Sequence, residues 1–495
     1  MADIKEQGTV EQANPIRQEQ SKGHDVSQVE RVVSASEFDE KDHIDYGRID
    51  QEISPEENKR LKRMIDRRVL PIMIFTYFLQ ALDKGTLSFC IDHELSRGFR
   101  TSPRPYSWLT TCIYIAVLVV EYPTNWIIQH VPLGKYLGAN IVLRGSVLAC
   151  HAAAVNFPSI LALRTLLGIF EAVCQPAFLV MSSMWYKREE QAEIVTYWYM
   201  MNGGQQIVGG ILSYCFTLLK TGPITSWQAL FITYGTFSVL WGLFVLWWLP
   251  DSPMRAQCFS EEDKRLMIER VRGNQTGMQN RKFRPEQVKE ALSDLQTCCY
   301  CLIAICTTLP TSGRGAFANI IITGFKFTVL QSQLLAMVLG AVIIIILLTS
   351  TWLVKKTGQN LIVVGFYVIP SFVGTIVLMT VENKNKASQA AFSSTLAMSM
   401  ISRNVAGQTK KTVVISANFV SWCTGNAIGP QVFLSWNAPH YFIAFATHIG
   451  CYVLLVIVIV FLRFYLKTQN DAKDQLAAEG DVGARDGTLI HSFED

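Results

Sequence analysis

The chain has 495 residues, of which 50% are hydrophobic and 17% are charged, and its formal net charge is +4. Soluble domains carry roughly a quarter charged residues, so this balance excludes a purely soluble protein. The positive charges lie in loops between apolar stretches rather than on one face with aromatic residues, so nucleic-acid binding has no support. We therefore expect an all-α integral membrane protein in a lipid bilayer.

Apolar stretches long enough to cross a membrane recur along the chain in two series. A spanning helix needs about 20 mostly apolar residues. The stretches cover residues 70–90, 107–128, 133–155, 158–181, 194–219 and 227–249, followed by 299–324, 328–354, 361–381, 412–435 and 442–466. A weaker stretch at 387–402 is shorter than a usual span, and we predict a short or atypical tenth helix there.

The charged loops give the chain an orientation and a division into parts. Lysine and arginine gather in cytoplasmic loops, and the segment before the first stretch is rich in both. Both termini are therefore expected in the cytoplasm, and the membrane is expected to be the plasma membrane. The predicted parts are a disordered cytoplasmic tail (1–66), a six-helix half (67–250), a cytoplasmic central loop (251–296), a second helical half (297–467) and a cytoplasmic tail (468–495). Two six-helix halves with a solute site between them are typical of secondary transporters of the major facilitator type.

Charged side chains within the spans are the first candidates for function. Each costs roughly 2.5 to 3.5 kcal/mol at the bilayer centre, so we expect them to face the interior of the helix bundle. Asp83 in the first stretch and Glu171 in the fourth are predicted to carry protons that couple to solute movement. Arg164 and Glu121 are interpreted as a structural ion pair that holds helices together.

Amide side chains form a second set of candidates. Asn202 and Gln206 share a helical face in the fifth stretch, and Asn426 and Gln431 lie in the eleventh. Amides can hydrogen-bond a solute in a central cavity, and we predict that these four do so. The glycines beside them are explained by close helix packing alone.

Several motifs together resemble the fungal allantoate permease family of the major facilitator superfamily. They are Leu82-Asp83-Lys84, the run from Arg164 through Gly168 to Glu171 and Pro176, Trp185 through Gln191, Asn202-Gly203-Gly204, Leu249 through Pro253, Asn404 through Lys411, and Gly425 through Gln431. The resemblance implies proton-linked uptake of a small organic anion, such as allantoate, ureidosuccinate, a vitamin or a small peptide. It also implies that cations in the first and seventh spans contact the carboxylate of the solute, and here Lys84 and Arg314 occupy those spans.

Three departures from the family pattern accompany this resemblance. One is that the family normally has a full-length tenth helix before Asn404, where this chain has only the short stretch. Arg314 and Lys326 stand where the family is expected to have uncharged residues, which indicates a changed substrate. Efflux of a secondary metabolite and a non-transporting membrane sensor remain alternatives to uptake. An enzyme is not expected, because no metal-hydrolase, nucleophile or phosphate-loop motif occurs. We expect no cofactor or metal, and a monomer whose partners are the anionic solute and protons.

Overall fold

The computed structural model describes residues 53–90, 103–218, 224–272, 289, 293–324, 329–357, 360–380, 408–437 and 441–478. Within these ranges every regular element is a helix, which confirms the all-α prediction. Six described helical segments are long and apolar enough to cross a membrane by length and composition, and Leu361–Ile376 is a shorter apolar helix. The predicted tenth helix at 387–402 and Lys326 lie outside the described residues.

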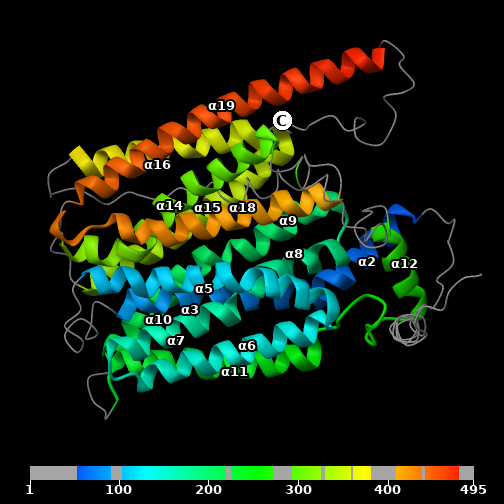
Figure 1. Cartoon of the computed structure of the whole chain (residues 1–495). Coiled ribbons are helices and arrows are strands. Elements are labelled where there is room, and N and C mark those ends of the chain that lie inside the picture. The colour runs from blue at the N-terminus through cyan, green and yellow to red at the C-terminus, as the bar shows by residue number, and fades with distance from the viewer. Residues whose placement is uncertain are drawn as a thin grey trace, which may run out of the picture. The chain divides into compact units, whose positions relative to one another are not determined.

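The first half of the chain supplies the helices in the lower part of Figure 1. They are α3 (Leu70–Cys90), α5 (Pro103–His130), α6 (Leu133–Cys150), the short η2 (His151–Ala153), α7 (Phe157–Glu171), α8 (Cys174–Trp185), α9 (Arg188–Tyr199), α10 (Met201–Leu218) and α11 (Ser226–Trp248). Each predicted stretch of this half coincides with one helix or with two that follow directly on each other. The fourth stretch corresponds to α7 with α8, and the fifth to α9 with α10.

The second half supplies the helices in the upper part of Figure 1. They are α14 (Leu295–Gly324), α15 (Val329–Thr357), α16 (Asn360–Thr380), α18 (Gln408–Ile428), the short η3 (Gly429–Val432) and η4 (Ser435–Asn437), and α19 (Phe442–Ala478). Pro310 lies inside α14 and Pro370 inside α16. Proline inside a helix removes one backbone hydrogen bond and loosens the helix locally. The last helix continues to Ala478, beyond the predicted end of its span at residue 466.

Two amphipathic helices lie against one end of the bundle, which we name the α2 end (Figure 1). They are α2 (Pro55–Arg68) and α12 (Glu261–Arg272). The prediction of disorder up to residue 66 is wrong for the part that forms α2. Ser54 and Glu57 form a reciprocal capping box around Pro55 at the first helical position, and the apolar side chains of Leu61 and Ile65 are buried. These features give the segment both a helix start and a face to pack.

A buried arginine of α12 ties this helix to its neighbours. Arg270 donates to the Glu190 carboxylate at 2.6 Å and to Asn58 Oδ1 at 2.6 Å. Arg60 of α2 pairs with Asp263 of α12 at 2.5 Å. The segment after α11 is therefore attached to both α2 and the start of α9 by hydrogen bonds and ion pairs.

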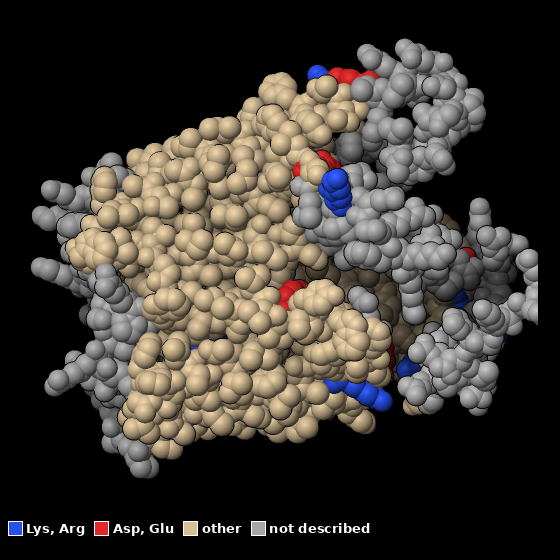
Figure 2. All heavy atoms as spheres, in the orientation of Figure 1, with Lys and Arg blue, Asp and Glu red and all other residues tan. Residues whose placement is uncertain are grey.

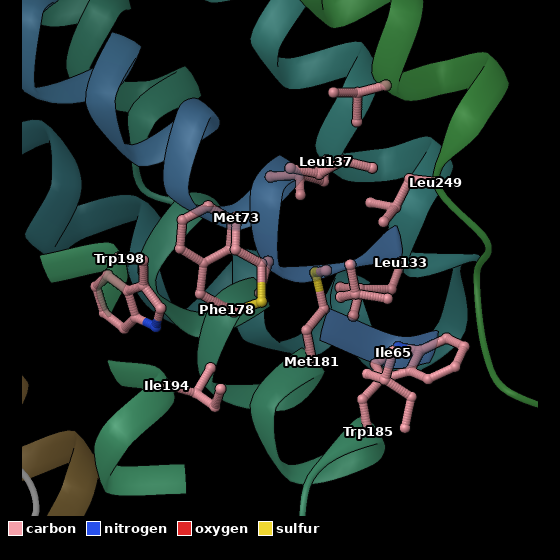
Figure 3. Close-up of a cluster of buried hydrophobic side chains, with 14 of the residues drawn as sticks. Ile65, Met73, Leu133, Leu137, Phe178, Met181, Trp185, Ile194, Trp198 and Leu249 are labelled. Carbon is pink, nitrogen blue, oxygen red and sulfur yellow. The ribbon is translucent and has the colours of Figure 1, made fainter. Parts of the chain in front are cut away.

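Apolar side chains pack in clusters, some within one half and others across both halves, as Leu79 and Phe419 do. The cluster of the first half contains Met73, Leu137, Phe178 and Trp198, and Figure 3 shows how these side chains converge from different helices. A second cluster joins α14, α16 and α19 through residues such as Tyr300 and Leu455. On the face seen in Figure 2, the surface over the helices is mostly uncharged, and most described charges lie toward the α2 end. This distribution suits helices that are surrounded by lipid.

The two halves approach each other closely where α10 crosses α15. A Cβ atom added to Gly203 would lie 2.5 Å from the carbonyl oxygen of Gly340, and one added to Gly340 would lie 2.5 Å from that of Gly203. Only residues without a side chain allow the backbones to approach so closely. The glycines of the fifth span therefore serve packing, as the sequence indicated.

Candidate functional site

Neighbouring charged residues of α3 contact different partners. Asp83 and Lys84 are adjacent in sequence, so their side chains leave the helix about 100° apart. Gln80 lies one turn before Lys84 on the same face of the helix. The direction of each side chain decides whether it joins the core of the first half or the junction of the two halves.

Asp83 is paired inside the first half. Its Oδ2 atom lies 3.0 Å from Nε of Arg144, and each of the two side chains is only 1% exposed. The Arg144 guanidinium also lies 3.8 Å from the sulfur of Cys174. A pair buried this completely holds α3 against α6, and this environment favours a structural role. The proton-coupling role of Asp83 stays a prediction.

Lys84 is paired with the other predicted proton carrier, Glu171 of α7. The Lys84 ammonium forms an ion pair with Oε1 of Glu171, and Gln80 donates to the same oxygen at 3.1 Å. The Lys84 side chain is 29% exposed, whereas that of Glu171 is 2% exposed. The lysine can therefore be reached from outside the protein core, but the carboxylate that neutralises it cannot.

Aromatic rings from both halves surround the Lys84 ammonium. It lies 5.8 Å from the ring centre of Tyr114 on α5 and 5.7 Å from that of Trp422 on α18. Both distances fall within the range of cation–π attraction. Lys84 thus marks a place where the first and second halves meet, which is where a transporter of this architecture holds its solute.

The predicted amides of α10 have separate surroundings. Asn202 donates to the hydroxyl of Tyr77 at 3.1 Å and to the backbone carbonyl of Tyr199 at 2.8 Å. Its bond to Tyr77 connects α10 to α3 two turns before Lys84, on nearly the same face of the helix. Gln206 is half-buried beside Gly340, where α10 crosses α15.

The predicted amides near the end of the eleventh span act between and within helices. Asn426 is buried and donates to the carbonyl of Trp422 in its own helix at 2.8 Å. Gln431 of η3 donates to the Thr111 hydroxyl of α5 at 2.9 Å, and Thr111 donates to the carbonyl of Ala427 at 2.8 Å. These bonds join the two halves at the end of the bundle away from α2. The four amides are therefore spread over several contacts rather than gathered around Lys84.

The remaining predicted charges do not join the Lys84 pair. Arg314 on α14 is half-buried and donates to the carbonyl of Pro310 at 3.3 Å. Arg164 on α7 lies 5.9 Å from the ring centre of Phe231. Among the described residues, the ion pairs do not include Arg164 with Glu121, and the Glu121 carboxylate accepts a hydrogen bond from Asn125 of its own helix at 3.0 Å.

A further ion pair joins the halves at the α2 end. Lys355 of α15 lies 2.9 Å from Glu193 of α9, which also accepts a hydrogen bond from Tyr197 at 2.7 Å. Burial by itself raises the pKa of Glu193, but the hydrogen bonds from Lys355 and Tyr197 outweigh it and hold the pKa below its ordinary value. Thr196 and Thr351 add a hydroxyl contact of 3.0 Å nearby.

The sequence missed the partners that complete the site. Tyr114, Trp422 and Gln80 gave no signal beyond their residue types, because aromatic residues and single amides are common in spans. Arg144 was noticeable as a charge in a span, yet its pairing with Asp83 depends on how α3 packs against α6. Within the part of the chain that the structure describes, no cluster of His, Cys, Asp or Glu could hold a metal ion.

The apolar helices and the buried charges between them define a multi-pass membrane protein. Residues 73–430 match the family model of the Major Facilitator Superfamily, and the chain belongs to this superfamily. An uncharacterized transporter of Schizosaccharomyces pombe is 34% identical, over 86% of this chain and 82% of its own length. The allantoate permease of Saccharomyces cerevisiae is 29% identical, over 86% of this chain and 83% of its own length. These matches confirm the resemblance to the fungal allantoate permease family.

A solved structure supports the same fold. The structure of a proton:xylose symporter superposes with a TM-score of 0.60 at 12% identity, covering 80% of this chain and 95% of its own. At this identity the likeness shows the fold alone. The family and the relatives are transporters, so the chain is a secondary transporter for a small solute and not an enzyme.

Proposed function

We propose that the protein imports a small organic anion together with protons across the plasma membrane, with the α2 end in the cytoplasm. The observation that carries the proposal is the Lys84–Glu171 pair at the junction of the two halves. A half-exposed cation offers a carboxylate a binding partner, and a buried carboxylate offers a proton a place to bind. The six Lys and Arg side chains of α2 support the orientation, because cytoplasmic segments are enriched in these residues.

Exchange of partners at Lys84 links the solute to the proton. A solute carboxylate that binds the Lys84 ammonium competes with Glu171 for the same charge. Glu171 would then remain as a buried carboxylate without a cation, which costs several kcal/mol. Protonation of Glu171 removes this cost, so binding of the anion and binding of the proton favour each other. Release of the proton lets Glu171 pair with Lys84 again and displaces the solute.

The surrounding groups contribute shape and orientation. Tyr114 and Trp422 provide aromatic walls from the two halves, so a solute held between them contacts both halves at once. Gln80 holds the Glu171 oxygen that faces Lys84. Rocking of one half against the other would then open the site to each side of the membrane in turn.

The direct test is uptake of radiolabelled carboxylates by cells that express the chain. A panel of allantoate, ureidosuccinate and a dipeptide is offered at acidic and at neutral external pH. We expect at least one carboxylate to accumulate faster at acidic pH, and Lys84→Gln to abolish that uptake. Lys59→Gln on the exposed face of α2 is the matched control and should transport normally.

The result also separates the competing functions. Uptake that does not respond to pH would exclude proton coupling, and normal uptake by Lys84→Gln would exclude its role in binding. Loss of preloaded solute from cells without accumulation would favour efflux. Specific binding of a carboxylate to purified protein without flux in either direction would favour a sensor.

A further inference from the structure

Glu121 lies on the face of α5 that the second half covers. Thr111, Tyr114, Leu118, Glu121 and Asn125 follow one another at alternating spacings of three and four residues, which places them in one stripe along the helix. Thr111 bonds to η3 and α18, and Tyr114 packs edge-on against Trp422 at 5.8 Å. The stripe that carries Glu121 therefore runs along the junction of the two halves.

The surroundings of Glu121 disfavour a permanent charge. Its Oε1 atom accepts a hydrogen bond from Asn125 at 3.0 Å, and its Oε2 atom is buried without a hydrogen-bond partner among the described residues. No Lys, Arg or His of the described part of the chain forms an ion pair with it. An ionised side chain buried within the membrane without a cation is costly, which marks it as a functional candidate. Pro123, two residues farther along, leaves the carbonyl of Val119 without its usual donor and loosens the helix here.

Glu121 lies between the Lys84 site and the α2 end. Tyr114 is level with Lys84, and seven residues farther along α5 correspond to about 10 Å toward the α2 end. A second measure uses α7, the fourth span, which crosses the membrane in the same direction as α5. Gly168 of α7 packs against Ile113 and Ala116 of α5, so Glu171 is about 5 Å short of the level of Glu121.

Few titratable groups act on this carboxyl group from the helices that pack on α5. Arg164 and Glu171 belong to α7 and lie farther from the α2 end. Cys423 of α18 interacts electrostatically with Glu121 and is buried. Among the side chains that the structure describes on these helices, none supplies Glu121 with a cation of its own at the α2 end.

We propose that Glu121 is a second proton-binding site, which takes up the proton from Glu171 and releases it toward the α2 end. The proposal rests on proton coupling at Glu171 as the proposed function. One proton moves from the neutral acid of Glu171 to the carboxylate of Glu121, directly or through water, with no change of oxidation state. Glu171 regains its charge and pairs with Lys84, while Glu121 becomes a neutral acid without needing a cation. Opening of the halves at the α2 end then lets the proton leave.

The first experiment detects the proton without a solute. Infrared difference spectra of the full-length protein in lipid nanodiscs are recorded while the pH is changed, and the C=O stretch of protonated carboxyl groups is followed. We expect Glu121→Gln to remove one pH-dependent component of this band, whereas Glu121→Asp should keep a shifted one. Glu262→Gln, which removes an exposed carboxylate of α12, should keep the component that Glu121→Gln removes. A band whose pH dependence is unaltered in Glu121→Gln would overturn the proposal. A Glu121 component that is present at every pH would also overturn it, because this carboxyl group would then never release its proton.

The second experiment separates this proposal from the proposed function. In proteoliposomes with radiolabelled allantoate, Glu121→Gln should lose accumulation driven by a proton gradient and keep exchange of labelled for unlabelled solute. Gradient-driven accumulation by Glu121→Gln equal to that of the wild type would overturn the role of Glu121. Wild-type accumulation that ignores the gradient would instead refute coupling at Glu171. The infrared result stands by itself if allantoate is not carried.

Discussion

Replacing one member of the Lys84–Glu171 pair should destabilise the protein more than replacing both. Lys84→Gln leaves the Glu171 carboxylate, 2% exposed, with Gln80 as its neutral donor among the described residues. Removing one partner of a buried pair costs about 3 to 5 kcal/mol, and the 29% exposure of Lys84 sets the expectation near 3 kcal/mol. Glu171→Gln leaves a lysine that water can still reach, so its cost should be smaller.

The double variant removes both charges and with them the unpaired buried carboxylate. We expect its stability to return to within about 1 kcal/mol of the wild type, because two neutral amides replace the pair without a buried charge. The assay is the melting temperature of the four purified proteins in one detergent, with uptake measured in parallel. The double variant should regain stability but not uptake. A double variant as unstable as the sum of the single variants would refute the direct interaction of Lys84 with Glu171.

Three further predictions concern other contacts. Asp83→Asn leaves the buried guanidinium of Arg144 without its anion, so the melting temperature should fall by the equivalent of about 3 to 5 kcal/mol. The protein that still folds should keep the pH dependence of uptake. Gly203→Leu should abolish transport, because α10 and α15 can no longer approach each other, but it should not prevent membrane insertion. Uptake measures the transport and cell-surface labelling measures the insertion. Normal uptake would argue against this crossing. The lowered pKa of Glu193 means that its link to Lys355 stabilises the fold above the ordinary glutamate pKa and is lost as the pH falls through the lowered value. Melting temperatures between about pH 3 and pH 6 should therefore decline less steeply in Lys355→Gln than in the wild type.

The sequence by itself determined the membrane class, the position of most spans and the identity of the charged residues inside them. The length of an apolar run follows from the thickness of the bilayer, so the stretches at 70–90 and 227–249 predicted α3 and α11 closely. The family motifs also identified the superfamily, because they are local patterns that can be read along the chain. The helix α2 was missed because its polar residues outweigh the short buried face that holds it.

Only the tertiary structure decided which charge pairs with which. Asp83 and Lys84 are neighbours in the chain, yet Asp83 is buried against Arg144 whereas Lys84 reaches the junction of the halves. The sequence assigned Glu121 to an ion pair with Arg164, whereas in the described structure its carboxylate accepts a hydrogen bond from Asn125. Pairing depends on the rotation and depth of each packed helix. A single sequence does not record these quantities, because they arise from the contacts between helices far apart in the chain.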